Sequence, residues 1–135
     1  MSAAYLIDSD VCIHAVRRGN ESLTAMIRAI RPDGLAISVI SYGEVLEGVL
    51  YSRERLANRQ KWDAFVSGVD VVDVTMAVAD VWADLRGALR SKGNIIADAD
   101  LLIASTAIRF GMTLVSRNVR RFGRVPGLTL LVPDD

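Results

Sequence analysis

The sequence has few of the residues on which disulfide-bonded, zinc-bound and membrane-spanning proteins depend. Cys12 is the only cysteine among 135 residues, so the chain can form neither an internal disulfide nor a cysteine-based zinc cluster. His14 is the only histidine, which leaves it without a second histidine for a catalytic dyad. No apolar run reaches the roughly 18 residues that a transmembrane helix needs, and Asp8 and Asp10 interrupt any signal-peptide pattern. These absences predict a cytoplasmic protein that does not enter a membrane.

The composition is that of one folded domain spanning residues 1–135. Hydrophobic residues make up 51% of the chain, which excludes a disordered protein, and a domain of this size buries roughly two-thirds of its unfolded surface. The formal net charge is zero, so charge alone gives no argument for nucleic-acid binding. Among the 16 basic residues only Lys61 and Lys92 are lysine. Arginine is the better two-pronged phosphate ligand, although high arginine usage also follows genome composition.

Short apolar runs alternate with segments of helical periodicity along the chain. We expect strands at residues 3–8, 35–38, 69–74, 112–116 and 128–132, the last at a sheet edge. We expect helices at residues 9–18, 20–30, 41–52, 54–67, 76–91 and 98–110, with caps at Ser9, Asn20, Ser41 and Thr75. The alternation predicts an α/β protein with a mostly parallel sheet and helices on both faces. Ligands bind such sheets beyond the carboxyl ends of the strands, where we expect Asp8, Ser116 and Asn118.

Three acidic residues stand at the ends or starts of these elements. Asp8 ends the first apolar run, Glu44 follows the second run by six residues, and Asp100 opens the apolar segment 100–104. Carboxylates in such places are the ligands from which α/β proteins build Mg²⁺ or Mn²⁺ sites. We therefore predict that Asp8, Glu44 and Asp100 form one metal-binding site that cleaves phosphodiesters.

Each acid also has a local structural explanation. Asp8 is equally typical of a turn or helix cap. The spacing of Ser41 and Glu44 matches a capping box, in which Ser41 caps the helix and Glu44 accepts from its backbone amide. One of Asp98 and Asp100 is expected to cap the helix at 98–110.

Other polar residues near these positions have open roles. Asp10 is either a first-turn acid favoured by the helix dipole or a further ligand. Ser116 and Asn118 follow a strand, where they can steady a metal-bound water or act as ordinary polar residues. A basic cluster beside them can contact a nucleic-acid backbone, balance the acidic site or form a solvated face; it comprises Arg117, Arg120, Arg121 and Arg124.

Four segments, taken in order over essentially the whole chain, resemble the PIN-domain ribonucleases and among them the VapC-like toxins of toxin–antitoxin pairs. The segments are 6–10, 40–48, 100–104 and 114–118, the last continued by Phe122 and 125–128. The first motif usually reads Asp-Thr-Asn after an apolar pair, whereas Ser9 and Asp10 stand here. Many relatives have a fourth acid near the closing motif, where Asn118 and Arg121 stand here. This departure predicts one firmly bound metal ion rather than two.

The resemblance implies a three-layer α/β/α sandwich around four to five short strands, and a Mg²⁺- or Mn²⁺-dependent endoribonuclease. Asp8 and Asp100 would bind the metal and Glu44 would act through water. Supporting roles would fall to Ser9, Asp10, Asp98, Ser116 and Asn118, and weaker RNA contacts to Arg117, Arg120 and Arg121. The implied partners are an RNA substrate, a second copy of the chain and a small VapB-like antitoxin that covers the site. Apolar positions on helices 41–52 and 54–67 are the interface candidates.

Two other functions compete with this hypothesis. Asp8 and Asp10 also suit the nucleophile and general acid of a haloacid-dehalogenase-like phosphatase, with Ser38 and Lys92 mimicking later motifs. That family places its last acidic pair after a strand, whereas Asp98 and Asp100 are expected to open a helix. The third hypothesis is a degenerate PIN module that binds RNA or a partner protein without cutting.

Overall fold

The computed structural model describes residues 3–17 and 19–133, which form a five-stranded parallel sheet with helices on both faces. The strand order is β3-β2-β1-β4-β5, and every strand pairing is parallel. The strands are β1 (Tyr5–Ile7), β2 (Leu35–Ser38), β3 (Asp70–Val72), β4 (Thr113–Val115) and β5 (Leu130–Leu131). The predicted sheet and the edge position of the last strand are confirmed.

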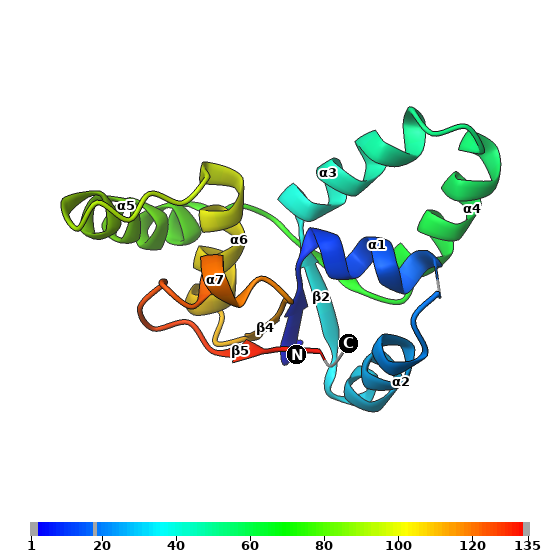
Figure 1. The fold of residues 1–135 in the computed structure, drawn as a ribbon, viewed down its shortest axis with the longest axis horizontal. Helices are drawn as coiled ribbons and strands as arrows, with labels where there is room; N and C mark the ends of the chain where they lie inside the picture. The colour runs from blue at the N-terminus through cyan, green and yellow to red at the C-terminus, as the bar shows by residue number, and fades with distance from the viewer. Residues whose placement is uncertain (1–2, 18, 134–135) are drawn as a thin grey trace.

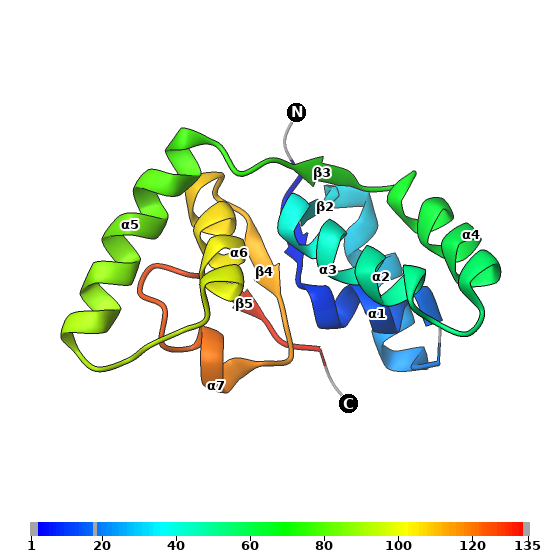
Figure 2. The ribbon, with the colours of Figure 1, turned by 90° about the horizontal axis from the view of Figure 1, so that it is seen from above.

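The helices divide into two groups that lie on either side of the sheet (Figures 1 and 2). One group comprises α1 (Ser9–Arg17), α2 (Glu21–Ile30), the 3₁₀ turn η1 (Arg31–Asp33), α3 (Val39–Leu50) and α4 (Arg55–Val66). The other comprises α5 (Met76–Ser91), α6 (Asp98–Arg109) and the short α7 (Val119–Phe122). The predicted three-layer α/β/α architecture is therefore confirmed.

Neighbouring side chains of the central strands point to opposite faces of the sheet, and each face has its own hydrophobic core. Leu6 of β1 belongs to the core beneath α5 and α6, whereas its neighbour Ile7 belongs to the core beneath α1 to α4. Successive strand residues point to opposite faces, so two buried apolar neighbours indicate a strand covered on both sides. Leu6 pairs with Leu114, and Ile7 pairs with Val115. This register ends β1 and β4 at the same edge of the sheet.

The predicted capping residues of three helices are wrong, although α1 and α6 begin where the sequence predicts. Ser38, not Ser41, caps α3 by accepting the Ile40 amide at 3.1 Å, so the capping box at Ser41 and Glu44 does not form. Asp8, not Ser9, caps α1: its Oδ1 accepts the Val11 amide at 2.9 Å. Ala97 occupies the N-cap position of α6, where one of two aspartates was expected.

Other boundaries agree with the sequence. Asn20 and Thr75 cap α2 and α5 as predicted. Gly111, just past the end of α6, has a φ of +65°, a left-handed conformation that glycine adopts without strain. The predicted end of the first helix at residue 18, and the domain ends at residues 1–2 and 134–135, lie outside the described residues. Among the helices of the described ranges, none has the length and apolar character needed to cross a bilayer.

Candidate active site

A cleft of about 670 Å³ opens beyond the carboxyl ends of β1 and β4. All three acids singled out from the sequence line it, although they come from three different helices or helix starts. The parallel sheet explains this meeting, since β1 and β4 end together and the Asp8 amide donates to the Val115 carbonyl at 3.1 Å. The lining residues are Asp8, Ser9, Asp10, Ile13, Glu44, Val45, Asp100, Arg117, Asn118 and Arg121.

Asp8 is the most buried acid of the cleft, with 6% of its surface exposed. Burial raises the pKa of its carboxyl group above 3.8, and the nearby Asp10 and Asp100 raise it further. Hydrogen bonds from the Ser116 hydroxyl and the Val11 amide act in the opposite direction, because they stabilise the charged form. Burial and the neighbouring charges therefore destabilise the charged form of Asp8, and a nearby cation would stabilise it.

Glu44 reaches the cleft from the second turn of α3. Its Oε1 accepts a hydrogen bond of 2.6 Å from the Ser9 hydroxyl, which also lies 3.0 Å from the hydroxyl of the buried Ser41. A serine hydroxyl has one proton, so Ser9 donates to the carboxylate and accepts from Ser41. Ser9 thus orients the Glu44 carboxylate.

Asp100 lies in the first turn of α6 and forms an ion pair with Arg121, whose Nη1 is 2.9 Å from Asp100 Oδ2. Burial raises the pKa of the Asp100 carboxyl group, Arg121 lowers it, and the charge of Glu44 raises it. Asp100 raises the pKa of Asp8, and Glu44 raises the pKa of Asp100, so the charge of Asp100 lies within electrostatic range of both other acids.

Ser116 and Asn118 connect the two sides of the cleft. The Ser116 hydroxyl, fully buried, bonds Asp8 and accepts the Asn118 amide at 3.0 Å. Asn118 in turn caps α7, since its Oδ1 accepts the Arg121 amide at 3.0 Å. A chain of polar contacts therefore runs from Asp8 to Arg121 and through its ion pair to Asp100.

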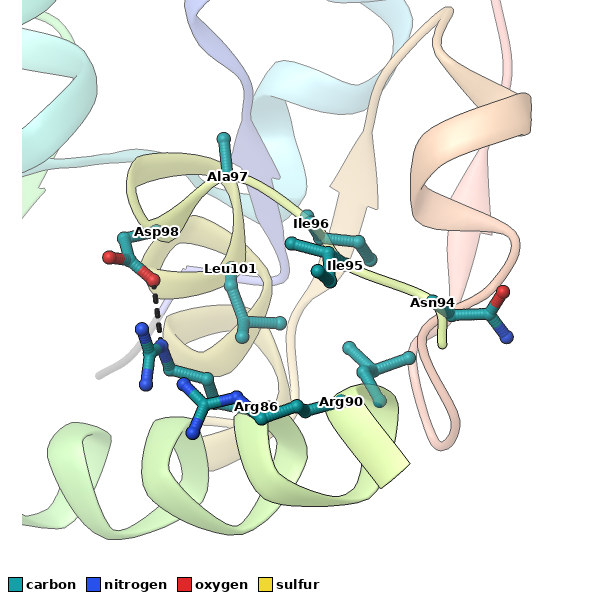
Figure 3. Close-up of a pocket in the computed structure, with 9 residues that line it drawn as sticks. Arg86, Arg90, Asn94, Ile95, Ile96, Ala97, Asp98 and Leu101 are labelled. Carbon is teal, nitrogen blue, oxygen red and sulfur yellow. Dashed lines mark hydrogen bonds and ion pairs between the residues drawn. The ribbon is translucent and has the colours of Figure 1, made fainter. Parts of the chain in front are cut away.

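Not every predicted site residue lies in this cleft. Asp98 turns away from it and pairs with Arg86 of α5 at 3.0 Å, in a separate hollow between α5 and the start of α6 (Figure 3). Arg120 is exposed and does not line the cleft. Asp10 lines the rim, with its side chain 62% exposed and 3.6 Å from His14. Arg117 lines the cleft with Nε and Nη2 buried and without a hydrogen-bond partner among the described residues.

Two lining residues were not anticipated. Ile13 and Val45 form an apolar side of the cleft; Ile13 lies one turn along α1 from Ser9, and Val45 directly follows Glu44 in α3. Both fit the ordinary core-facing pattern of an amphipathic helix, so no sequence signal separates them from other apolar residues. The tertiary contact between Ser9 and Ser41 was also missed, because Ser41 was assigned to its own helix cap.

The donor set of the cleft fits a hard divalent cation. Its ligating atoms are carboxylate and hydroxyl oxygens, which Mg²⁺ and Mn²⁺ prefer over nitrogen and sulfur. Within residues 3–17 and 19–133, no three acidic, histidine or cysteine side chains already enclose a metal-sized space. Ser9 holds Glu44 and Arg121 holds Asp100, so binding by all three acids requires these side chains to readjust.

Comparison with known proteins gives one consistent family. The PIN domain model matches residues 5–128. The chain is 34% identical to Ribonuclease VapC2 of Rickettsia felis over 93% of its length and 95% of that protein. It is 27% identical to the tRNA(fMet)-specific endonuclease VapC of Shigella flexneri over 92% of its length and 93% of that protein. The fold matches a chain in the crystal structure of VapBC2 from Rickettsia felis bound to promoter DNA, with a TM-score of 0.90 and 33% identity. The match covers 96% of this chain and 98% of that chain.

Proposed function

The chain belongs to the PIN-domain family, and we propose that its acidic cleft is the active site of a metal-dependent endoribonuclease. It is a ribonuclease toxin of the VapC kind, because its similarity to VapC ribonucleases covers nearly the whole of both chains. The observation that carries the assignment of the site is the meeting of Asp8, Glu44 and Asp100 in one cleft at the carboxyl edge of the sheet.

In this proposal Asp8 and Asp100 hold one Mg²⁺ or Mn²⁺, and Glu44 acts through a water molecule. The bound metal ion would lower the pKa of a water molecule and polarise the scissile phosphate. Ser9 keeps the Glu44 carboxylate oriented, while Ser116 fixes Asp8 through a hydrogen bond. The apolar side chains of Ile13 and Val45 limit the access of bulk water from one side.

The competing phosphatase hypothesis loses its supporting residues in the fold. Ser38 is fully buried and caps α3, and Lys92 follows the end of α5; neither lines the cleft. The last acidic pair opens α6 instead of following a strand. The degenerate module remains the relevant alternative, since it predicts the same fold without cleavage.

We propose three macromolecular partners for this chain. The relatives named as ribonucleases support an RNA substrate, and the VapBC2 complex supports a VapB-like antitoxin that covers the cleft. A second copy of the chain is the third, for which Tyr51 and Leu56 at the α3–α4 turn are candidates because they are 87% and 82% exposed. With RNA as its substrate, the protein would act in the cytoplasm.

Asparagine substitution of the two proposed metal ligands tests the assignment. Asp8→Asn and Asp100→Asn remove one negative charge each while keeping side-chain shape, so cleavage of a labelled RNA in MgCl₂ should fall by about 100-fold or more. Asp84→Asn on the exposed side of α5 is the matched control and should cleave like wild type. Wild-type protein that leaves RNA intact would support the degenerate module. Full activity in both cleft variants would contradict the proposal that this cleft is the active site.

A further inference from the structure

Arg121 is the one arginine or lysine that forms an ion pair with an acid of the cleft among the described residues. The Arg121–Asp100 pair differs from the other ion pairs of the described chain in the exposure of its acid. The Asp100 side chain is 21% exposed, whereas the acids of the other pairs are 58–62% exposed; these are Asp10, Asp63 and Asp98. A less exposed pair is less screened by water and contributes more than a surface pair does.

The position of Arg121 is fixed from both sides. Its amide donates to Asn118 Oδ1 at 3.0 Å, and the next residue, Phe122, is 2% exposed in the core beneath α5 and α6. Asn118 is itself held by the Ser116 hydroxyl that bonds Asp8. The backbone at Arg121 is therefore held in place, and its guanidinium group contacts Asp100 from this fixed position.

We infer that Arg121 is a resident cation of the active site, which competes with a divalent metal ion for Asp100 and so sets the metal concentration at which the site loads. This inference rests on the proposed function. In the ion pair the guanidinium group neutralises the charge of Asp100, whose side chain is 21% exposed. The ion pair engages Oδ2 of Asp100, so a metal ion that binds through both carboxylate oxygens must displace Arg121 from that oxygen. The charge of Arg121 also repels a divalent cation nearby.

Metal affinity measured by isothermal titration calorimetry with MnCl₂ tests the competition without an activity assay. Arg121→Gln should bind Mn²⁺ about three- to tenfold more tightly than wild type, since it removes a part-buried ion pair and a repulsive charge. Arg121→Lys keeps the charge and should stay within about twofold of wild type. Arg124→Gln removes the same charge from an exposed neighbour outside the cleft and should also match wild type.

The outcomes separate this inference from the proposed function. Equal or weaker Mn²⁺ affinity in Arg121→Gln than in wild type would overturn the competition while leaving the metal site in place. An equal gain in Arg124→Gln would overturn it too, because general charge and not the contact with Asp100 would then be responsible. If no protein of the set binds Mn²⁺, the metal-dependent function and the competition both fail.

Discussion

At the residue scale, Asp8 caps a helix and lines the acidic cleft at once, so the two roles that the sequence left as alternatives are compatible in one residue. One carboxylate oxygen accepts the Val11 amide and caps α1, and the same buried group faces Asp10 and Asp100 across the cleft. A cap needs an oxygen at the helix start, and a metal site at a sheet edge needs one in the same place. The two explanations were never exclusive, which is why sequence reasoning found the residue but could not choose between them.

The raised pKa of Asp8 gives a prediction about stability and pH. The native state binds the carboxyl proton more tightly than the unfolded state does, so this group lowers the free energy of unfolding as the pH rises above 3.8. Asp8→Asn retains an oxygen for the Val11 amide and never becomes charged. In EDTA, its melting temperature relative to wild type should therefore increase with pH, by roughly a few degrees between acidic and neutral conditions. Thermal denaturation over a pH series measures this difference. A difference that is constant or falls with pH would contradict the electrostatic description of the site.

At the scale of elements, the helices and strands could be located well from the sequence, but the residues that cap several helices could not. Ser41 has the spacing of a cap for α3, yet its hydroxyl lies against Ser9 while Ser38 caps the helix. A local pattern does not distinguish a hydroxyl that bonds its own helix from one that bonds another helix. The same limit applies to α6, where Asp98 bonds Arg86 and Asp100 bonds Arg121 while Ala97 takes the cap position.

The packing of α4 on α3 gives a prediction about stability. Trp62 is fully buried, stacked on Phe65 with ring centres 5.7 Å apart and tilted against Tyr42 of α3 at 5.8 Å. Trp62→Ala should lower the free energy of unfolding by about 3–5 kcal/mol, because it leaves a large cavity. Trp62→Phe should cost less than about half of that, because a ring remains and the buried, unpaired indole N–H is removed. Urea denaturation measures both values, and equal losses for the two variants would show that ring packing is not what holds α4.

At the scale of the whole molecule, the site exists because a parallel sheet brings distant segments to one edge. Asp8 and Asp100 are far apart in sequence, and the pairing of β1 with β4 places Asp8 beside Ser116. Alternating strands and helices predicted the sheet and the edge, and the order of the motifs predicted which acids meet there. The arrangement of side chains within the cleft could not be predicted, since Arg121 reaches Asp100 through a cap and a turn that depend on tertiary packing.

Removal of divalent metal is the most direct test of the account that this cleft is a metal-dependent nuclease site. Wild-type protein dialysed against EDTA should cut an end-labelled RNA about 100-fold more slowly or not at all, and excess MgCl₂ or MnCl₂ should restore cleavage. Restoration should fail in Asp8→Asn prepared in the same way. RNA cleavage by wild type that continues unchanged in EDTA would contradict the account.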